Sequence, residues 1–141
     1  MKTTYISHSV DETEKLAASL ATELKSRRFL CFYGGLGAGK TTFTRGLVKS
    51  IIPECLPLVH SPTFAIVNEY LGKTESIFHF DLYRIKNEDD LFSTGFFDYG
   101  ERNGIILTEW SEDFTAVLPK NAIIVQIEVL SENERKFTIT L

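Results

Sequence analysis

The chain has 141 residues, of which 43% are hydrophobic and 24% charged, and its formal net charge is -4. This length favours a single domain over residues 1–141 with a real hydrophobic core, and the composition is ordinary for a soluble globular protein. The negative charge argues against a protein that grips nucleic acid by itself, because such proteins usually carry a basic surface.

The sequence also speaks against a membrane protein. No apolar run approaches the roughly 18 residues needed to cross a bilayer, and residues 1–5 lack the apolar core of a signal peptide. We therefore expect a cytoplasmic protein with no membrane partner. Neither of the two cysteines has a second ligand at metal spacing, and a disulfide between them would be unusual in a reducing compartment.

The N-terminal part predicts a strand, a helix and a second strand. Residues 2–7 alternate loosely and predict a short edge strand. Ser9 followed by Glu12 matches a capping box, and apolar positions at helical spacing predict a helix over about 10–25. Residues 28–34 are short, aromatic and bounded by glycine, which predicts a buried strand.

Residues 34–41, Gly-Gly-Leu-Gly-Ala-Gly-Lys-Thr, match the phosphate-binding loop pattern G-x-x-x-x-G-K-[ST]. They follow the predicted strand and precede an apolar helical stripe that Pro53 ends. Strand, glycine loop and helix together aim backbone N–H groups at one point, where a polyphosphate can bind. We therefore predict nucleoside triphosphate binding, with Lys40 at the β- and γ-phosphates and the Thr41 hydroxyl on Mg²⁺.

The middle of the chain predicts a loop followed by a hairpin. Three of the four prolines fall within residues 53–62, which indicates a loop and not a regular element. Residues 63–71 and 75–85 predict two strands joined around residues 72–74.

The C-terminal part predicts further short elements. Asn87 can cap a short helix over 88–94 that Gly95 ends, and residues 96–100 are expected to be irregular. A buried strand, a short helix and a final strand pair are then predicted over residues 104–110, 111–117, and 122–130 with 135–141.

Strands that alternate with helices and end in strand pairs predict an α/β fold. We expect a P-loop NTPase-like, three-layer α/β/α arrangement with a mixed, mainly parallel central sheet and antiparallel edge strands. Ligands of such sheets bind beyond the carboxyl ends of the central strands. That rule directs attention to the acids found there.

Two acids end apolar runs: Asp81 follows residues 78–80, and Glu109 follows residues 105–108. Either can serve as a metal ligand, and the other can then orient or deprotonate an attacking water. The sequence leaves this assignment open. His79, next to Asp81, is either a site residue or, more commonly, a hydrogen-bonded, half-buried histidine.

Residues 61–64, Ser-Pro-Thr-Phe, follow the proline-rich loop. Small switch GTPases place a threonine here whose hydroxyl and backbone sense the γ-phosphate and Mg²⁺, which makes Thr63 a candidate. The alternative is a simple turn before a strand. Trp110 can stack on a base or a partner, although a lone tryptophan near a strand end more often packs in the interior.

Four motifs in this order resemble the TsaE (YjeE) family: Gly-x-Leu-Gly-Ala-Gly-Lys-Thr-Thr over 34–42, Ser-Pro-Thr-Phe over 61–64, His-x-Asp-x-Tyr-Arg over 79–84, and Glu-Trp over 109–110. The resemblance runs from about residue 9 to residue 130. That family is the ATPase subunit of the bacterial machinery that makes N6-threonylcarbamoyladenosine at position 37 of tRNA. One departure is Gly35, where the family commonly carries an acidic residue.

The resemblance implies roles for individual residues. Thr41 and Glu109 would hold Mg²⁺, with Asp81 at or near the ion, and Thr42 would cap the α- and β-phosphates of ATP or ADP. Thr63 would belong to a switch loop, and Thr13 would lie near the nucleoside. The implied catalytic set is Lys40, Asp81, Glu109 and Thr63, and the implied nucleotide-binding set is Thr13, Gly35, Leu36, Gly37, Ala38, Gly39, Lys40, Thr41 and Thr42.

The resemblance also implies partners, namely a TsaD-type transferase and a TsaB-type scaffold, with tRNA contacted only indirectly through the complex. ATP hydrolysis would then reset or regulate that complex and would not make the modification itself. ATP is favoured over GTP because the guanine-reading Asn-Lys-x-Asp element is missing from the sequence.

Two other functions compete with this interpretation. A small-molecule P-loop kinase is disfavoured, because the arginines after the loop do not cluster into a lid: Arg45, Arg84, Arg102 and Arg135. A nucleotide-gated binding module with negligible turnover stays open.

Overall fold

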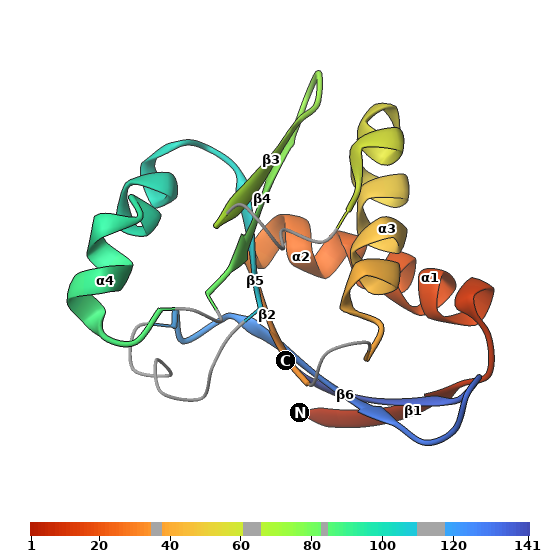
Figure 1. Ribbon diagram of the computed structural model, residues 1–141. Helices are drawn as coiled ribbons and strands as arrows, with labels where there is room; N and C mark the ends of the chain where they lie inside the picture. Colours follow the sequence, from red (N-terminus) through yellow and green to blue (C-terminus); the bar gives the residue numbers. More distant parts are fainter. Residues whose placement is uncertain (35–37, 61–65, 83–84, 110–117) are drawn as a thin grey trace.

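A computed structural model of the protein describes residues 1–34, 38–60, 66–82, 85–109 and 118–141 (Figure 1). Its strands are β1 (Lys2–Ser7), β2 (Phe29–Tyr33), β3 (Val67–Leu71), β4 (Ser76–Asp81), β5 (Ile105–Glu109), β6 (Ile123–Val129) and β7 (Arg135–Thr140). Its helices are α1 (Val10–Ser19), α2 (Ala21–Arg27), α3 (Lys40–Ile51) and α4 (Glu88–Ser93), with 3₁₀ helices η1 (Pro53–Leu58) and η2 (Phe96–Glu101). Within the described residues, no helix has the length and apolar character needed to span a bilayer.

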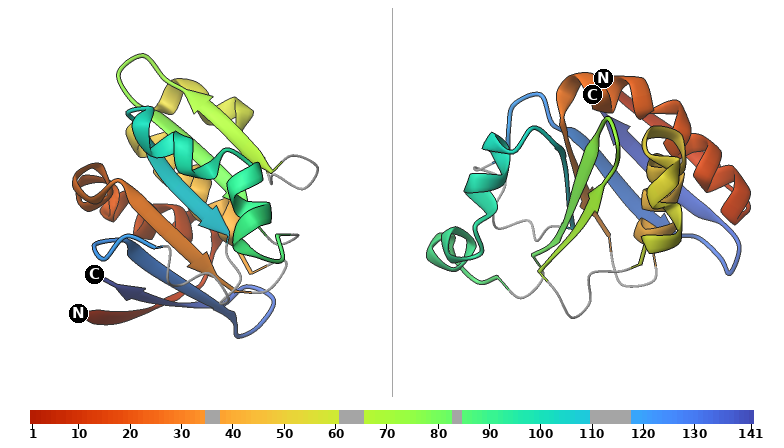
Figure 2. Two further views of the ribbon diagram at one scale, coloured as in Figure 1. Left: turned by 90° about the vertical axis from the view of Figure 1, so that its left-hand side faces the viewer. Right: turned by 90° about the horizontal axis from the view of Figure 1, so that it is seen from above.

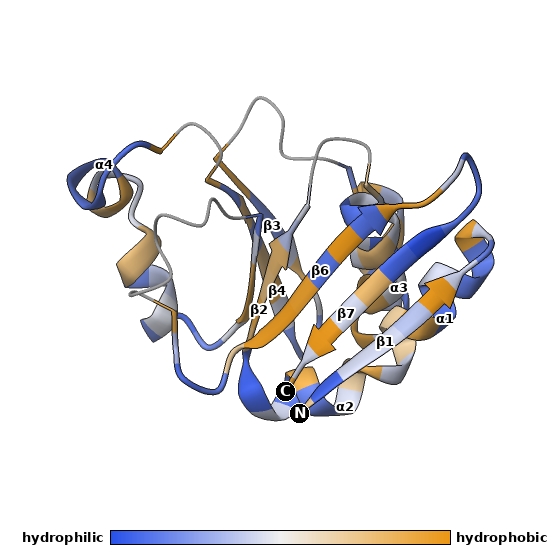
Figure 3. Ribbon diagram, turned by 90° about the horizontal axis from the view of Figure 1, so that it is seen from below, coloured by the Kyte–Doolittle hydropathy of each residue, from blue (hydrophilic) through white to orange (hydrophobic). Residues whose placement is uncertain are grey.

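The described strands form one seven-stranded sheet in the order β1-β7-β6-β2-β5-β4-β3. Strands β6, β2, β5 and β4 run parallel in the centre, whereas β1, β7 and β3 pair antiparallel toward the edges. The chain ends meet at one edge, where the amino group of Met1 donates to the carbonyl of Leu141 at 2.8 Å (Figure 3).

Helices cover both faces of this sheet. Helices α1, α2 and α3 lie on one face, and α4 with η2 lies on the other (Figures 1 and 2). Because side chains alternate along a strand, Ile77 of β4 packs toward the first layer and its neighbour Phe78 toward the second. The three-layer α/β/α fold with a mainly parallel centre and antiparallel edges is therefore confirmed.

Most local predictions are confirmed with shorter bounds. Residues 67–71 and 76–81 form the antiparallel hairpin, and the last strand pair is also antiparallel. The Asn87 side chain accepts a hydrogen bond from the Asp90 amide at 2.8 Å, which caps α4. Cys31 is fully buried, and burial raises the pKa of its thiol to about 11, as expected of a small core residue.

Three local predictions were wrong. The helix expected over 10–25 is two helices, because the Leu20 amide turns back to the Ala17 carbonyl at 3.0 Å and closes α1. Residues 53–58 are a 3₁₀ helix and not a loop; proline suits the first helical position, where no N–H is needed. Residues 96–101 are also a 3₁₀ helix, which packs Phe96 edge-on against Phe29 and Phe80. The helix predicted over 111–117 lies outside the described residues.

Helix α3 approaches α1 closely at Gly46. A methyl group on Gly46 would lie 2.6 Å from the carbonyl oxygen of Glu14 and 2.8 Å from the Cβ of Ala17. The two helices therefore pack with backbone against backbone, which holds the first turn of α3 beside the first turn of α1.

We expect Gly46→Ala to destabilise the fold by about 1–3 kcal/mol, because the added methyl group overpacks the α1–α3 contact. Urea unfolding followed by circular dichroism measures this change. Gly100→Ala is the control, since nothing lies within 4 Å of a methyl group there. Equal stability of the two variants would contradict the close packing.

Candidate functional site

The carboxyl ends of β2, β4 and β5 meet at one edge of the sheet, next to the start of α3. Register places Glu109 beside Phe32 on one side and beside Asp81 on the other. Phe32 packs into the core beneath α3, so the partners that share its face, Glu109 and Asp81, also project on the α3 side. The structure thus brings the two predicted acids together on the correct face.

Lys40, the first residue of α3, reaches Glu109. Its Nζ lies 3.9 Å from Oε1 of Glu109, and the two side chains are only 16% and 11% exposed. At this distance and burial the attraction is less screened than at the surface, although it is a loose pair. A cation and a carboxylate therefore share a sheltered point just beyond the strand ends.

Glycine is required on both sides of the predicted phosphate loop. Gly34 has φ +150°, and a methyl group there would lie 2.8 Å from the carbonyl oxygen of Ile127. Gly39 has φ +112°, in the left-handed region that side chains rarely adopt. Ala38 between them is buried at 2% exposure. The predicted residues Gly35, Leu36 and Gly37 lie outside the described residues.

The first turn of α3 carries two half-buried threonines. The hydroxyl of Thr41 has no hydrogen-bond partner among the residues that the structure describes, whereas the nearby Thr44 hydroxyl is used within the helix, donating to the Lys40 carbonyl at 2.9 Å. Thr42, the other threonine of this turn, likewise has no hydroxyl partner among the described residues. The hydroxyls of Thr41 and Thr42 are therefore the ones that a ligand could use at this helix start.

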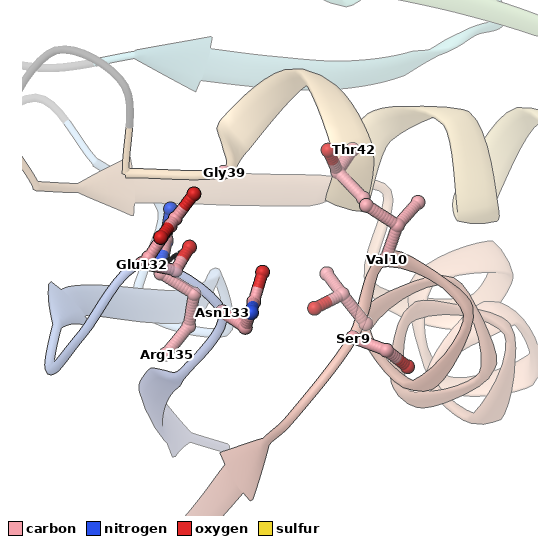
Figure 4. Close-up of a pocket in the computed structure, with 8 residues that line it drawn as sticks. Ser9, Val10, Gly39, Thr42, Glu132, Asn133 and Arg135 are labelled. Carbon is pink, nitrogen blue, oxygen red and sulfur yellow. Dashed lines mark hydrogen bonds between the residues drawn. The ribbon is translucent and has the colours of Figure 1, made fainter.

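A pocket of about 160 Å³ adjoins the start of α3. Figure 4 shows side chains from three segments facing it: the start of α1, the start of α3 and the β6–β7 turn. Its lining residues are Ser9, Val10, Thr13, Gly39, Thr42, Glu132, Asn133 and Arg135. Three predicted nucleotide-binding residues, Thr13, Gly39 and Thr42, thus meet here although α1 and α3 are distant in the sequence.

Sequence reasoning missed the contribution of the β6–β7 turn. The guanidinium of Arg135 shapes this turn by donating to the carbonyls of Ser131 at 2.7 Å, Glu132 at 3.2 Å and Glu134 at 3.0 Å. Asn133 at the tip thereby comes to line the pocket. Only the polar turn itself was predictable, because no motif marks its residues.

The described residues contain no cluster of three or more His, Cys, Asp or Glu side chains that could cage a metal. Mg²⁺ usually binds through one or two protein ligands and fills its other positions with water and phosphate oxygens. Glu109 and Asp81, adjacent in register, and Thr41, in the first turn of α3, carry hard oxygen atoms of the kind that this ion prefers. Thr63 and Trp110, the other predicted site residues, lie outside the described residues.

Comparisons with known proteins agree with this architecture. A family model described as "Threonylcarbamoyl adenosine biosynthesis protein TsaE" matches residues 7–137. The chain is also similar to the solved structure of YdiB from Bacillus subtilis, with a TM-score of 0.66, 26% identity, and coverage of 99% of this chain and 84% of that one.

Three curated relatives carry the name "tRNA threonylcarbamoyladenosine biosynthesis protein TsaE". The Aquifex aeolicus protein is 40% identical over 95% of this chain and 92% of its own length. The Rickettsia felis protein is 39% identical over 95% of this chain and 77% of its own length, and the Bacillus subtilis protein is 33% identical over 92% and 80%. Matches of this extent, together with the family model over residues 7–137, establish that the chain belongs to the TsaE family.

Proposed function

We propose that this protein is the ATP-binding and ATP-hydrolysing subunit of the machinery that makes threonylcarbamoyladenosine at position 37 of tRNA. The names of the relatives support the pathway. The observation that carries the enzymatic part is the approach of Lys40 to Glu109, with Asp81 in register beside it, at the first turn of α3. A phosphoryl-transfer site needs a cation at the phosphates and acidic groups that hold a metal ion or position the nucleophile.

Lys40 is proposed to bind the β- and γ-phosphates of ATP, with the backbone amides at the start of α3 supplying further donors. A triphosphate competes with Glu109 for the Lys40 ammonium, because both are anions at the same cation. Binding of the nucleotide therefore releases the Glu109 carboxylate for another role.

Thr41, Glu109 and Asp81 are proposed to hold Mg²⁺, which neutralises charge that develops on the phosphate oxygens. Register sets Asp81 and Glu109 side by side, so one acid can hold the ion while the other orients the attacking water. Which acid takes which role stays open. The proposed role of Thr63 beside the γ-phosphate rests on the family resemblance alone.

The pocket beside Gly39 and Thr42 is proposed to receive the nucleoside. It adjoins the helix start where the phosphates would bind, and it is lined by amide, hydroxyl and carboxylate groups that can read a base or a ribose. Asn133 offers both donors and an acceptor, which suits the edge of adenine.

The proposed partners are a TsaD-type transferase and a TsaB-type scaffold, with tRNA contacted only through the complex. The formal net charge of -4 supports indirect contact. In this scheme hydrolysis resets or regulates the complex between turnovers.

The competing kinase function finds little support in the described arginines. Among the arginines after the loop, Arg102 pairs with Glu69 at 2.7 Å while stacking on Phe78, and Arg135 donates to carbonyls of its own turn. Arginines held in this way do not form a lid over the phosphates. Release of inorganic phosphate without any acceptor molecule would separate an ATPase both from a kinase and from a binding module without turnover.

Lys40→Ala should weaken ATP binding by about tenfold or more, because a hydrogen bond to a charged group contributes about 1.5–3 kcal/mol. Calorimetric titration with ATP measures the affinity. Lys49→Ala, an exposed lysine at the other end of α3, is the matched control and should bind normally. Unchanged affinity in Lys40→Ala would reject the phosphate site.

Glu109→Gln should still bind nucleotide but lose about 10²–10⁴-fold in turnover, the range for a lost general base. Phosphate release should be measured in the complex reconstituted with TsaD- and TsaB-type proteins, with the exposed Glu101→Gln as control. Full turnover in Glu109→Gln would assign the catalytic acid to Asp81.

Asn133→Ala should weaken ATP binding several-fold, roughly the effect of one lost hydrogen bond, but leave the affinity for inorganic triphosphate unchanged. Triphosphate has no base, so it separates the nucleoside pocket from the phosphate site. Asn121→Ala serves as control, since Asn121 is exposed and outside the pocket. An equal loss for both ligands would argue against a nucleoside in this pocket.

A further inference from the structure

His79 is buried without a satisfied ring nitrogen. Its exposed fraction is 0%, and neither Nδ1 nor Nε2 has a hydrogen-bond partner among the residues that the structure describes. A buried polar group without a partner costs free energy, so folded proteins rarely keep one without a reason. The expectation of an ordinary hydrogen-bonded, half-buried histidine is therefore not met.

The imidazole lies next to the acid of the candidate site, although it is not aligned for a hydrogen bond. Its Nε2 lies 3.4 Å from Oε2 of Glu109, while the Lys40 ammonium lies 3.9 Å from the other oxygen, Oε1. The ring of Phe32 lies alongside, 6.4 Å away between ring centres. Glu109 thus lies between two groups, with Lys40 near Oε1 and His79 near Oε2.

We propose that His79 is a positioning residue for Glu109, donating from Nε2–H to Oε2 when Lys40 leaves Oε1 for the phosphates of a bound nucleotide. This inference rests on the proposed nucleotide site, and it takes Glu109 as the acid of the pair that holds Mg²⁺. Glu109 is only 11% exposed, so losing Lys40 would leave a largely buried carboxylate without its cation, which is unfavourable.

A hydrogen bond from His79 would offset part of the cost of burying the Glu109 carboxylate and would fix the rotamer of Glu109. It would also leave Oε1 facing the site. A shift of a few tenths of an ångström together with a small rotation of the ring would turn the 3.4 Å contact into a hydrogen bond. Removing a group that hydrogen-bonds to a metal-ligating side chain typically lowers metal affinity or activity by about 10–100-fold. His79 therefore acts through Glu109 and touches neither nucleotide nor metal.

The test compares His79→Leu, which removes the donor, with His79→Gln, whose amide N–H can replace Nε2–H. Ile77→Val is the matched control, because Ile77 is a fully buried residue on the same face of β4. The affinity for ADP is measured by calorimetry in Mg²⁺ and in EDTA, and each variant is checked for thermal unfolding.

We expect His79→Leu to reduce the gain in ADP affinity due to Mg²⁺ by about tenfold, with affinity in EDTA unchanged, and His79→Gln to recover most of it. Ile77→Val should leave the gain as in the unmodified protein. If His79→Leu retains the full gain, weakens binding equally with and without Mg²⁺, or is not rescued by His79→Gln, then the histidine has only a packing role.

A second arm tests whether His79 works through Glu109. In a Glu109→Gln background, His79→Leu should cause no further loss of Mg²⁺-dependent affinity, because residues that act through one another are not additive. The same fold-loss in both backgrounds would overturn the proposal. Failure of the unmodified protein to bind ADP at all would instead reject the proposed function itself.

Discussion

The site depends on the parallel register of three strands. Strands β2, β5 and β4 run in one direction, with Phe32, Glu109 and Asp81 side by side in register. Their carboxyl ends therefore form a single edge of the sheet. The amide of Leu82 donates to the Glu109 carbonyl at 3.1 Å, so the ladder continues past the acids and fixes their spacing. Lys40 at the head of α3 then faces them.

The packing of α1 against α3 provides the second part of the site. Gly46 allows the two helices to touch through their backbones, and the Ser9 hydroxyl caps α1 by accepting from the Glu12 amide at 3.1 Å. These two features bring Thr13 to the pocket that also contains Thr42. The proposed phosphate and nucleoside subsites therefore share one helix start, which couples the geometry of one to the other.

Two side chains of the protein approach the two carboxylate oxygens of Glu109. The Glu109 carboxylate lies between Lys40 and His79, and in the proposed scheme a bound polyanion draws the lysine away while the histidine remains beside the acid. The proposed exchange would account for the loose ion pair. A tight pair would compete with a triphosphate, whereas the absence of any pair would leave the acid without a fixed position. The uncommitted Nε2 of His79 fits that arrangement better than it fits a purely structural role.

The sequence by itself predicted most of the elements and indicated a candidate chemistry, because both depend on local patterns of residues. The glycine motif required a turn before a helix, the apolar runs that end at Asp81 and Glu109 marked buried strands, and Asn87 marked a helix start. Local patterns were insufficient where side-chain packing decides the backbone, as in the 3₁₀ helices at Pro53–Leu58 and Phe96–Glu101.

Only the tertiary structure decided which groups meet. Strand order sets Glu109 next to both Phe32 and Asp81, the β6–β7 turn brings Asn133 to a pocket beside Thr13, and burial leaves His79 without a hydrogen-bond partner among the described residues. Contacts of this kind join segments far apart in the chain. They depend on sheet register and helix packing, which no short stretch of sequence specifies.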